Sequence, residues 1–145
     1  ETPVLGADTE VTGHPVVHLW VSTPAPDLDV VAYLEDVAPD GTVTAYNMHG
    51  QLRASRRALA EAPYDNLGLP WHSHLEKDAR PLSANQPEEI VFDLLPMSYI
   101  FKAGHRVRLS LTFTDVERKE KAVSVNVLRG PTTPSRLTLP IIPAG

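Results

Sequence analysis

The clearest pattern in the chain is an alternation of apolar and polar residues in its second half. Between Arg106 and Thr114 every second residue is apolar, as expected for a strand with one buried and one wet face. Upstream, Ile90 to Leu95 alternates less cleanly. Lys102 to His105 lies between apolar runs and offers Gly104 for a positive φ angle. We therefore interpret Ile90 to Asp115 as two strands joined by a turn.

Further β-prone runs lie on both sides of this stretch. Pro39-Asp40-Gly41 and Asn47 to Gly50 are turn signals, and two hairpins in a row indicate an antiparallel meander. Pro140 places the last run at a sheet edge or strand end. The remaining predicted strands are Val16 to Val21, Asp29 to Val37, Thr42 to Tyr46, Gln51 to Ser55, Ala122 to Leu128 and Leu137 to Ile142.

Only one stretch has good helix formers throughout, Ala54 to Ala62, which on its own predicts two helical turns. It is too short to be stable unaided. The following residues, Pro63 to Pro87, contain four prolines and little periodicity, which indicates a long loop over the surface. Loops of this length in compact domains are typically functional or bind a neighbour.

About eight short strands, separated by turn residues and nearly without helix, predict an all-β fold, an antiparallel β-sandwich. At 145 residues the chain has the length of one domain and can bury a core without disulfides or metals. We therefore expect residues 1–145 to form a single domain.

Four segments, in order along the chain, carry a resemblance to a known family. They are Asp27 to Gly41 (DLDVVAYLEDVAPDG), Gly50 to Arg57 (GQLRASRR), Phe92 to Leu111 with its FKAGHRVRLSL core, and Ser135 to Pro143 (SRLTLPIIP). Together they resemble the C-terminal domain of the X-Pro dipeptidyl peptidase and cocaine esterase (CocE/NonD) serine hydrolases. The resemblance implies a jelly roll of the galactose-binding-like type. It also implies a non-catalytic part of a larger hydrolase, with the catalytic α/β-hydrolase domain of the same polypeptide as its partner.

The composition of the chain limits which other kinds of partner it is expected to bind. The net charge of −5 argues against nucleic acid, because a phosphate-binding module needs a basic face. No apolar stretch reaches the roughly 18 residues of a membrane span, and the N-terminus lacks a signal pattern. The absence of cysteine is compatible with the cytoplasm and excludes no compartment. The sequence leaves the oligomeric state open, a homo-oligomer included.

No residue of the chain is predicted to be catalytic. A serine hydrolase of the resembled family presents its nucleophile at a G-x-S-x-G turn, and no serine here has flanking glycines at that spacing. The resemblance assigns the family's catalytic serine, histidine and aspartate to a separate domain. We assign His105, in a turn of an all-β domain, a structural role.

Charged residues in the predicted strands indicate structural ion pairs. A guanidinium can meet a carboxylate with two parallel hydrogen bonds, and a sandwich would otherwise bury aspartates unpaired at a cost of several kcal/mol. An anion or substrate-carboxylate site is the open alternative. The residues concerned are Asp29, Asp36, Arg53, Arg57, Arg106 and Arg108.

Two segments contain residues of the kinds that bind metals, and we assign a metal site to neither. An extended His72-Ser73-His74-Leu75-Glu76 would place both histidines and the glutamate on one face, as in zinc sites, but no fourth ligand is evident. The aspartates between Asp27 and Asp40 lack the spacing of a calcium loop. No metal or other cofactor is expected.

The Pro-rich loop carries the predicted docking surface. Its large apolar residues lie outside the strand pattern, and such a patch indicates a partner. They are Tyr64, Leu67, Leu69 and Trp71, within Tyr64 to Leu75. The alternative is a free-standing carbohydrate-binding module with Trp20, Trp71 and Tyr64 as its sugar platform, although Trp20 is expected in the core of its strand. The substrate of the parent enzyme, ester or peptide, cannot be read from this chain.

Overall fold

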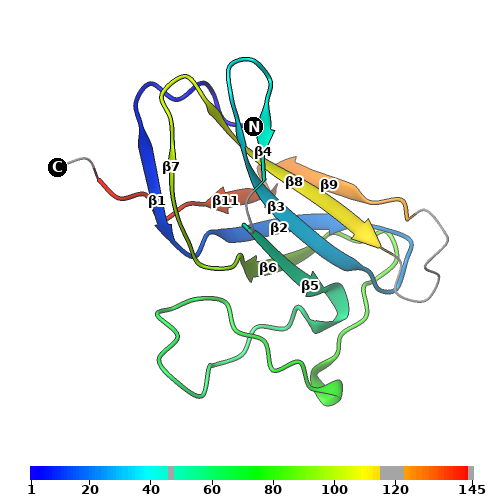
Figure 1. Cartoon of the computed structure of the whole chain (residues 1–145). Coiled ribbons are helices and arrows are strands. Elements are labelled where there is room, and N and C mark those ends of the chain that lie inside the picture. Colours follow the sequence, from blue (N-terminus) through cyan, green and yellow to red (C-terminus); the bar gives the residue numbers. More distant parts are fainter. Residues whose placement is uncertain (46–47, 115–122, 144–145) are drawn as a thin grey trace.

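The computed structural model describes residues 1–45, 48–114 and 123–143. Two antiparallel sheets face each other, and a two-stranded ribbon flanks them (Figure 1). A long loop, residues 57–87, runs outside the sheets. Each of the two sheets is built around its own central strand, which has neighbours on both sides.

The first sheet is centred on β3 (Asp29–Val37). Its partner β8 (Arg106–Thr114) pairs along the whole length of β3, while β4 (Val43–Thr44) and β5 (His49–Arg53) share the opposite edge. The first hairpin, β3 to β4, forms as predicted from Pro39-Asp40-Gly41. The meander does not continue, because β5 returns to β3 and does not pair with β4.

The second sheet is centred on β2 (Val16–Ser22). It pairs with β6 (Glu88–Asp93) on one edge and with β9 (Asn126–Gly130) and β11 (Arg136–Thr138) on the other. A short strand, β10 (Thr133–Pro134), pairs with β9. The flanking ribbon consists of β1 (Thr9–Gly13) and β7 (Met97–Phe101).

The core lies between the two sheets. Inward-facing residues from the central strands are fully buried, with exposed fractions of 0–2%. β5, β6 and β8 add buried side chains from both layers. The main members are Val17, Leu19, Val21, Val30, Ala32, Leu34, Leu52, Ile90, Phe92 and Val107. The all-β antiparallel sandwich predicted from the periodicity is therefore confirmed.

Several local predictions were wrong. Ile90 to Asp115 contains three strands, not two, because β7 lies between β6 and β8. The predicted turn at Lys102 to His105 is present, with Gly104 at φ +84°. β1 was not among the predicted strands. Trp20 is not a core residue, since it alternates with buried Leu19 and Val21 on the outer face of β2. The predicted strand Ala122 to Leu128 begins only at Asn126, in β9. Ala122, Tyr46 and Asn47 lie outside the described residues.

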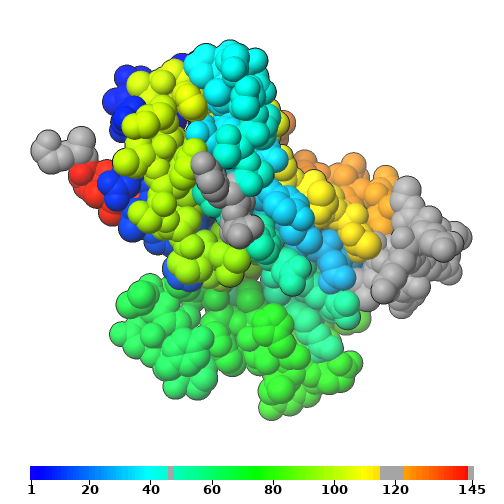
Figure 2. All heavy atoms as spheres, viewed as in Figure 1, coloured from blue at the N-terminus to red at the C-terminus, as the bar shows by residue number. Residues whose placement is uncertain are grey.

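The predicted helix Ala54 to Ala62 is replaced by one short 3-10 turn, η1 (Ala54–Arg56). A second, η2 (Glu76–Asp78), lies further along the long loop. The backbone after η1 instead pairs within the loop, where Leu59 bridges His72 and the Ala60 amide donates to the Trp71 carbonyl over 3.1 Å. Figure 2 shows the loop as a separate lobe below the sandwich.

Candidate functional site: the long loop and its anchors

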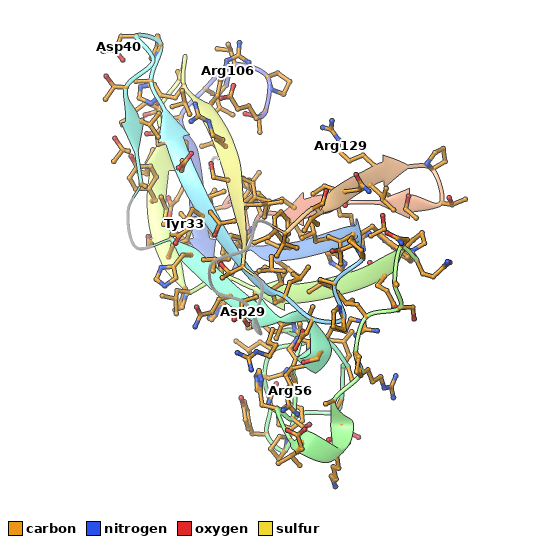
Figure 3. The ribbon with its side chains drawn as sticks, turned by 90° about the vertical axis from the view of Figure 1, so that its right-hand side faces the viewer. Asp29, Tyr33, Asp40, Arg56, Arg106 and Arg129 are labelled. Carbon is orange, nitrogen blue, oxygen red and sulfur yellow. The ribbon has the colours of Figure 1, made fainter. Side chains whose placement is uncertain are left out.

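The long loop is fixed to the sandwich at its base. The Arg80 amide donates to the Ser55 carbonyl and the Leu82 amide to the Pro26 carbonyl, both over 2.7 Å. Arg56 donates to the Leu75 carbonyl over 2.6 Å and also pairs with Glu76. Figure 3 places Arg56 in the lobe that the loop forms. The loop is therefore held by specific hydrogen bonds along its length, which makes it a defined surface.

His72 attaches the middle of the loop to β6 of the second sheet. The ring is buried, with Nε2 2.9 Å from the Val91 carbonyl oxygen and Nδ1 3.3 Å from that of Ala58. Both ring nitrogens thus face backbone carbonyls. His74 is exposed, and Glu76 pairs with Arg56. Within residues 1–45, 48–114 and 123–143, no group of three or more His, Cys, Asp or Glu side chains is placed to hold a metal ion.

The tip of the loop is a tight turn with a leucine at a position of positive φ. The Leu69 amide donates to the Asn66 carbonyl over 3.1 Å, and the residues between them, Leu67 and Gly68, have φ angles of +58° and +73°. Positive φ at both central positions is the pattern of a type I′ turn, in which Asn, Asp or Gly is preferred. The Asp65 carboxylate accepts from the Leu67 amide, and the Asn66 side chain donates to the Leu69 carbonyl. Leucine is thus held in a backbone conformation that disfavours it.

The predicted docking residues divide by exposure. Leu67 is 84% exposed and Tyr64 63%, whereas Leu69 and Trp71 are half-buried. All four line one hollow of about 510 Å³ between the loop and the ends of the sheets. Leu69 and Trp71 also line a second hollow of about 410 Å³ against the outer face of β2 and β6. Trp20 lines neither hollow, so the structure does not bring the three proposed platform aromatics together.

The expected ion pairs form with different partners and different burial. Asp29 and Arg53 stand directly opposite on β3 and β5 and pair over 3.1 Å. Their side chains are 39% and 46% exposed, so the aspartate is not buried as supposed. The Arg53 guanidinium has its pKa raised, chiefly by the hydrogen bond to Asp29.

Asp36 is buried, but no arginine neutralises it. Its carboxylate accepts from the Tyr99 hydroxyl and faces His105 Nδ1, each over 2.8 Å. Its side chain is 5% exposed, because Asp36 shares the inward face of β3 with Val30 and Leu34. The cluster ties β3 to β7 and to the turn before β8. His105 therefore contacts a structural aspartate.

Two of the remaining arginines, Arg106 and Arg108, contact the N-terminal segment. Arg106 donates to the Thr2 carbonyl over 3.0 Å. Arg108 pairs with Glu1 over 2.8 Å and with Glu35 over 3.5 Å. Glu35 stands directly opposite Arg108 in the β3–β8 register and also accepts from Ser110, and sequence reasoning missed it. The hydrogen bond from Arg108 holds the pKa of Glu1 below its ordinary value.

Arg57 is largely buried, with its side chain 11% exposed. It pairs with Glu88 of β6 over 3.0 Å and donates to the Ala54 carbonyl over 3.2 Å and to the Arg80 carbonyl. Burial would raise the pKa of Glu88, but the hydrogen bond and charge of Arg57, together with the Ser83 amide, hold that pKa below its ordinary value of 4.5. Arg57 thus joins the start of the loop, its end and the second sheet.

Replacing Arg57 with alanine is expected to lower the free energy of unfolding by about 2 to 3 kcal/mol at pH 7. Arg53→Ala is the matched control and should cost less than about 1 kcal/mol, because its pair is exposed to water. Ionised Glu88 contributes its full stability above pH 4.5, and this is lost as the pH falls through the lowered pKa. Urea unfolding at pH 7 and pH 3 measures both effects, and the Arg57→Ala penalty should shrink in acid. Equal penalties for the two variants would contradict the assignment.

The described residues contain no catalytic serine constellation. The described serine hydroxyls with hydrogen bonds contact Asp78, Glu35, Thr12, Asn126 and backbone groups, and none of these partners is a histidine ring. In these residues no helix is long and apolar enough to span a membrane. In fold, the described part of the chain is an antiparallel β-sandwich from which a long loop projects.

Comparison with known proteins agrees with this class. The family model of the X-Pro dipeptidyl-peptidase C-terminal non-catalytic domain matches residues 1–129. A relative named as a serine esterase in Mycobacterium tuberculosis is 40% identical over 139 residues, which cover 92% of this chain and 22% of that protein. Cocaine esterase of Rhodococcus is 29% identical over 160 residues, covering 97% of this chain and 25% of the esterase. The chain belongs to the X-Pro dipeptidyl-peptidase C-terminal non-catalytic domain family.

Solved structures share the fold. A CocE/NonD family hydrolase from Staphylococcus aureus superposes with a TM-score of 0.82 at 23% identity, covering 97% of this chain and 30% of the hydrolase. An alpha-amino acid ester hydrolase gives a TM-score of 0.74 at 23% identity, covering 97% and 25%. The chain thus spans between 22% and 30% of the length of these proteins.

Proposed function

We propose that this non-catalytic domain packs on the catalytic α/β-hydrolase domain of the same polypeptide and supports it, with Tyr64 to Leu75 as the docking surface. The family description and the small share of each relative that the chain covers support a linked partner. The names of the relatives favour an ester hydrolase as the parent enzyme. Selectivity for ester or peptide then resides outside this chain.

The observation that carries the proposal is the strained backbone and exposed side chain of Leu67. A non-glycine residue at positive φ costs about 1 to 3 kcal/mol, and such strain concentrates at functional positions. A leucine side chain left in water also forgoes about 1.5 to 3 kcal/mol of burial. Both penalties fall on one residue, at the tip of a turn fixed by Asp65 and Asn66. They are offset if Leu67 enters an apolar pocket of the partner domain.

The neighbours of Leu67 have the composition of an interface centre. Tyr64 and Trp71 line the same hollow, and buried aromatic anchors contribute much of the energy of interfaces. Leu59, 58% exposed, extends the apolar surface beyond Trp71 along the second hollow. Trp71 is half-buried against the sheet, so Leu67 is the better residue for testing docking without disturbing the domain.

Leu67→Asn is expected to act in opposite directions on the two forms of the protein. Asparagine tolerates positive φ, so the isolated chain should gain up to about 1 kcal/mol. In the full-length protein the same change should weaken docking by about 1 to 2 kcal/mol, because an apolar anchor is lost. Calorimetric melting of both forms measures the two effects. Val43→Thr, an exposed apolar position on β4 far from the loop, is the control and should change neither form.

A full-length Leu67→Asn protein that is stabilised as much as the isolated variant would contradict docking through this loop. A sugar-binding surface predicts another outcome: Trp71→Ala would abolish retention on a polysaccharide and leave the full-length protein's stability unaltered. If Trp71→Ala instead unfolds the isolated chain, the residue is structural and neither use of the loop applies to it.

The purified 145-residue chain is expected not to hydrolyse activated esters or X-Pro anilides, because its described residues contain no nucleophile bonded to a base. Release of 4-nitrophenol or 4-nitroaniline measures this. Turnover that survives full purification and disappears on mutation of one serine would show that the chain carries its own active site.

A further inference from the structure

Within residues 1–45, 48–114 and 123–143, the sandwich is open along one side, between β8 of the first sheet and β9 and β11 of the second. A cavity of about 590 Å³ lies there, and Leu109, Leu111, Val127 and Leu137 line it. These residues face inward, since in the strand registers they stand opposite buried core residues, Leu34, Ala32, Val21 and Val17 respectively. All four are nevertheless incompletely buried. Figure 3 shows β8 and β9 diverging here, with Arg129 on the β9 side.

The N-terminal segment already pairs with the free edge of β8. The Thr2 amide donates to the Val107 carbonyl over 2.9 Å, and the Val107 amide donates to Thr2 Oγ1 over 3.1 Å. Further along, the Leu5 amide donates to the His105 carbonyl. As residue numbers rise in one segment they fall in the other, so the pairing is antiparallel.

The register of this pairing is supported by a side-chain contact. If Thr2 stands opposite Val107, Glu1 stands opposite Arg108, and these two side chains pair over 2.8 Å. Backbone groups alternate in direction along a strand, so the amides and carbonyls of Leu109 and Leu111 point toward the same free edge as those of Val107. Beyond Val107, no strand within the described residues pairs with this edge.

We propose that, in the longer polypeptide, the residues immediately before Glu1 continue as a strand along Leu109 to Phe113 and close the open side of the sandwich. In the observed register the first, third and fifth residues upstream of Glu1 stand opposite Leu109, Leu111 and Phe113. Their side chains face the cavity and are apolar, because the strand must complete the core. The added strand also forms hydrogen bonds with the backbone amides and carbonyls along the free edge of β8, which would otherwise be open to pairing with other chains.

This inference shares with the proposed function only the premise that the domain is part of a longer polypeptide. It concerns the opposite side of the molecule from the long loop. Loss of loop docking would leave the added strand intact, and loss of the strand would leave the loop's anchor unchanged, so the two ideas fail separately.

A cysteine pair in the full-length protein tests the register. Thr112→Cys and a cysteine at the fourth residue upstream of Glu1 would stand opposite each other on the outer face, within reach of a disulfide. Mild oxidation should cross-link them within one chain, as peptide mass mapping would show. Cysteine at the third upstream residue, which faces the core, is the control and should not cross-link. Absence of the bond, equal cross-linking of the control, or a bond between two chains would overturn the proposal.

Hydrogen exchange in the unmodified full-length protein gives an answer that does not depend on variant folding. The amides of Leu109 and Leu111 should exchange as slowly as that of Val107. Exchange at the rate of an unpaired strand edge would equally overturn the added strand.

Discussion

Replacing Gly50 with alanine is expected to lower the free energy of unfolding by about 3 kcal/mol. Gly50 lies on β5 where the first sheet touches the end of β6 in the second, and the Leu95 amide donates to the His49 carbonyl at the same crossing. A Cβ at Gly50 would lie 2.5 Å from the Asp93 carbonyl oxygen and 3.0 Å from Leu94 Cα. Backbone atoms cannot rotate away, so the layers must separate.

Thermal melting of the isolated chain measures this effect. A loss of this size corresponds to a fall in Tm of roughly 6 to 12 °C for a protein of this length. Gly6→Ala is the matched control, because nothing lies within 4 Å of a Cβ built there. If both variants melt like the parent chain, the close approach of β5 and β6 is not as described.

Replacing Asp36 with alanine should cost about 3 kcal/mol, because the Tyr99 hydroxyl and the His105 ring both lose their acceptor. Its carboxylate is the acceptor that joins Tyr99 of β7 and His105 to β3. Asp36→Asn keeps one oxygen acceptor and should cost less. Asp29→Ala, on the same strand but in an exposed ion pair, should cost under about 1 kcal/mol. Urea unfolding of the three variants measures the order of their stability losses. An Asp36→Ala loss no larger than that of Asp29→Ala would contradict the structural role of Asp36.

The sandwich could be predicted because period-two alternation depends only on which residues face the core. β8 was clear for this reason, with Val107 buried and Arg108 turned outward. β1 was not, since its apolar content is one buried valine, and its pairing with β7 depends on a contact distant in sequence. Helix propensity at Ala54 to Ala62 was overridden, because Arg57 reaches Glu88 and Leu59 pairs with His72.

The partners in the ion pairs could not be predicted from the sequence. That charges in β3 need partners is a general requirement, but Asp29 meets Arg53, and Glu35 meets Arg108, only through the strand registers. The expected burial of Asp36 is confirmed and follows from its position on β3, where it has the same parity as Val30, Ala32 and Leu34. Its partners, His105 and Tyr99, lie more than 60 residues away and have no local signal.

The long loop was predicted from its proline content and from apolar residues outside the strand pattern. In the structure these apolar residues differ in their exposure to solvent. Trp71, the expected anchor, is half-buried by the packing of the loop on the second sheet, whereas Leu67 is presented at the tip. That difference follows from the turn at Asn66 to Leu69 and from the attachment at His72. Neither can be read from the sequence alone.

Hydroxyl-radical footprinting of the isolated chain and of the full-length protein tests the central claim, that the loop is the surface on which this domain meets its catalytic partner. In the isolated chain, Tyr64 and Leu67 should be oxidised readily, as their exposure requires. In the full-length protein both should be protected severalfold, while Val43 on β4 is labelled equally in the two forms. Equal labelling of Tyr64 and Leu67 in both proteins would contradict the account.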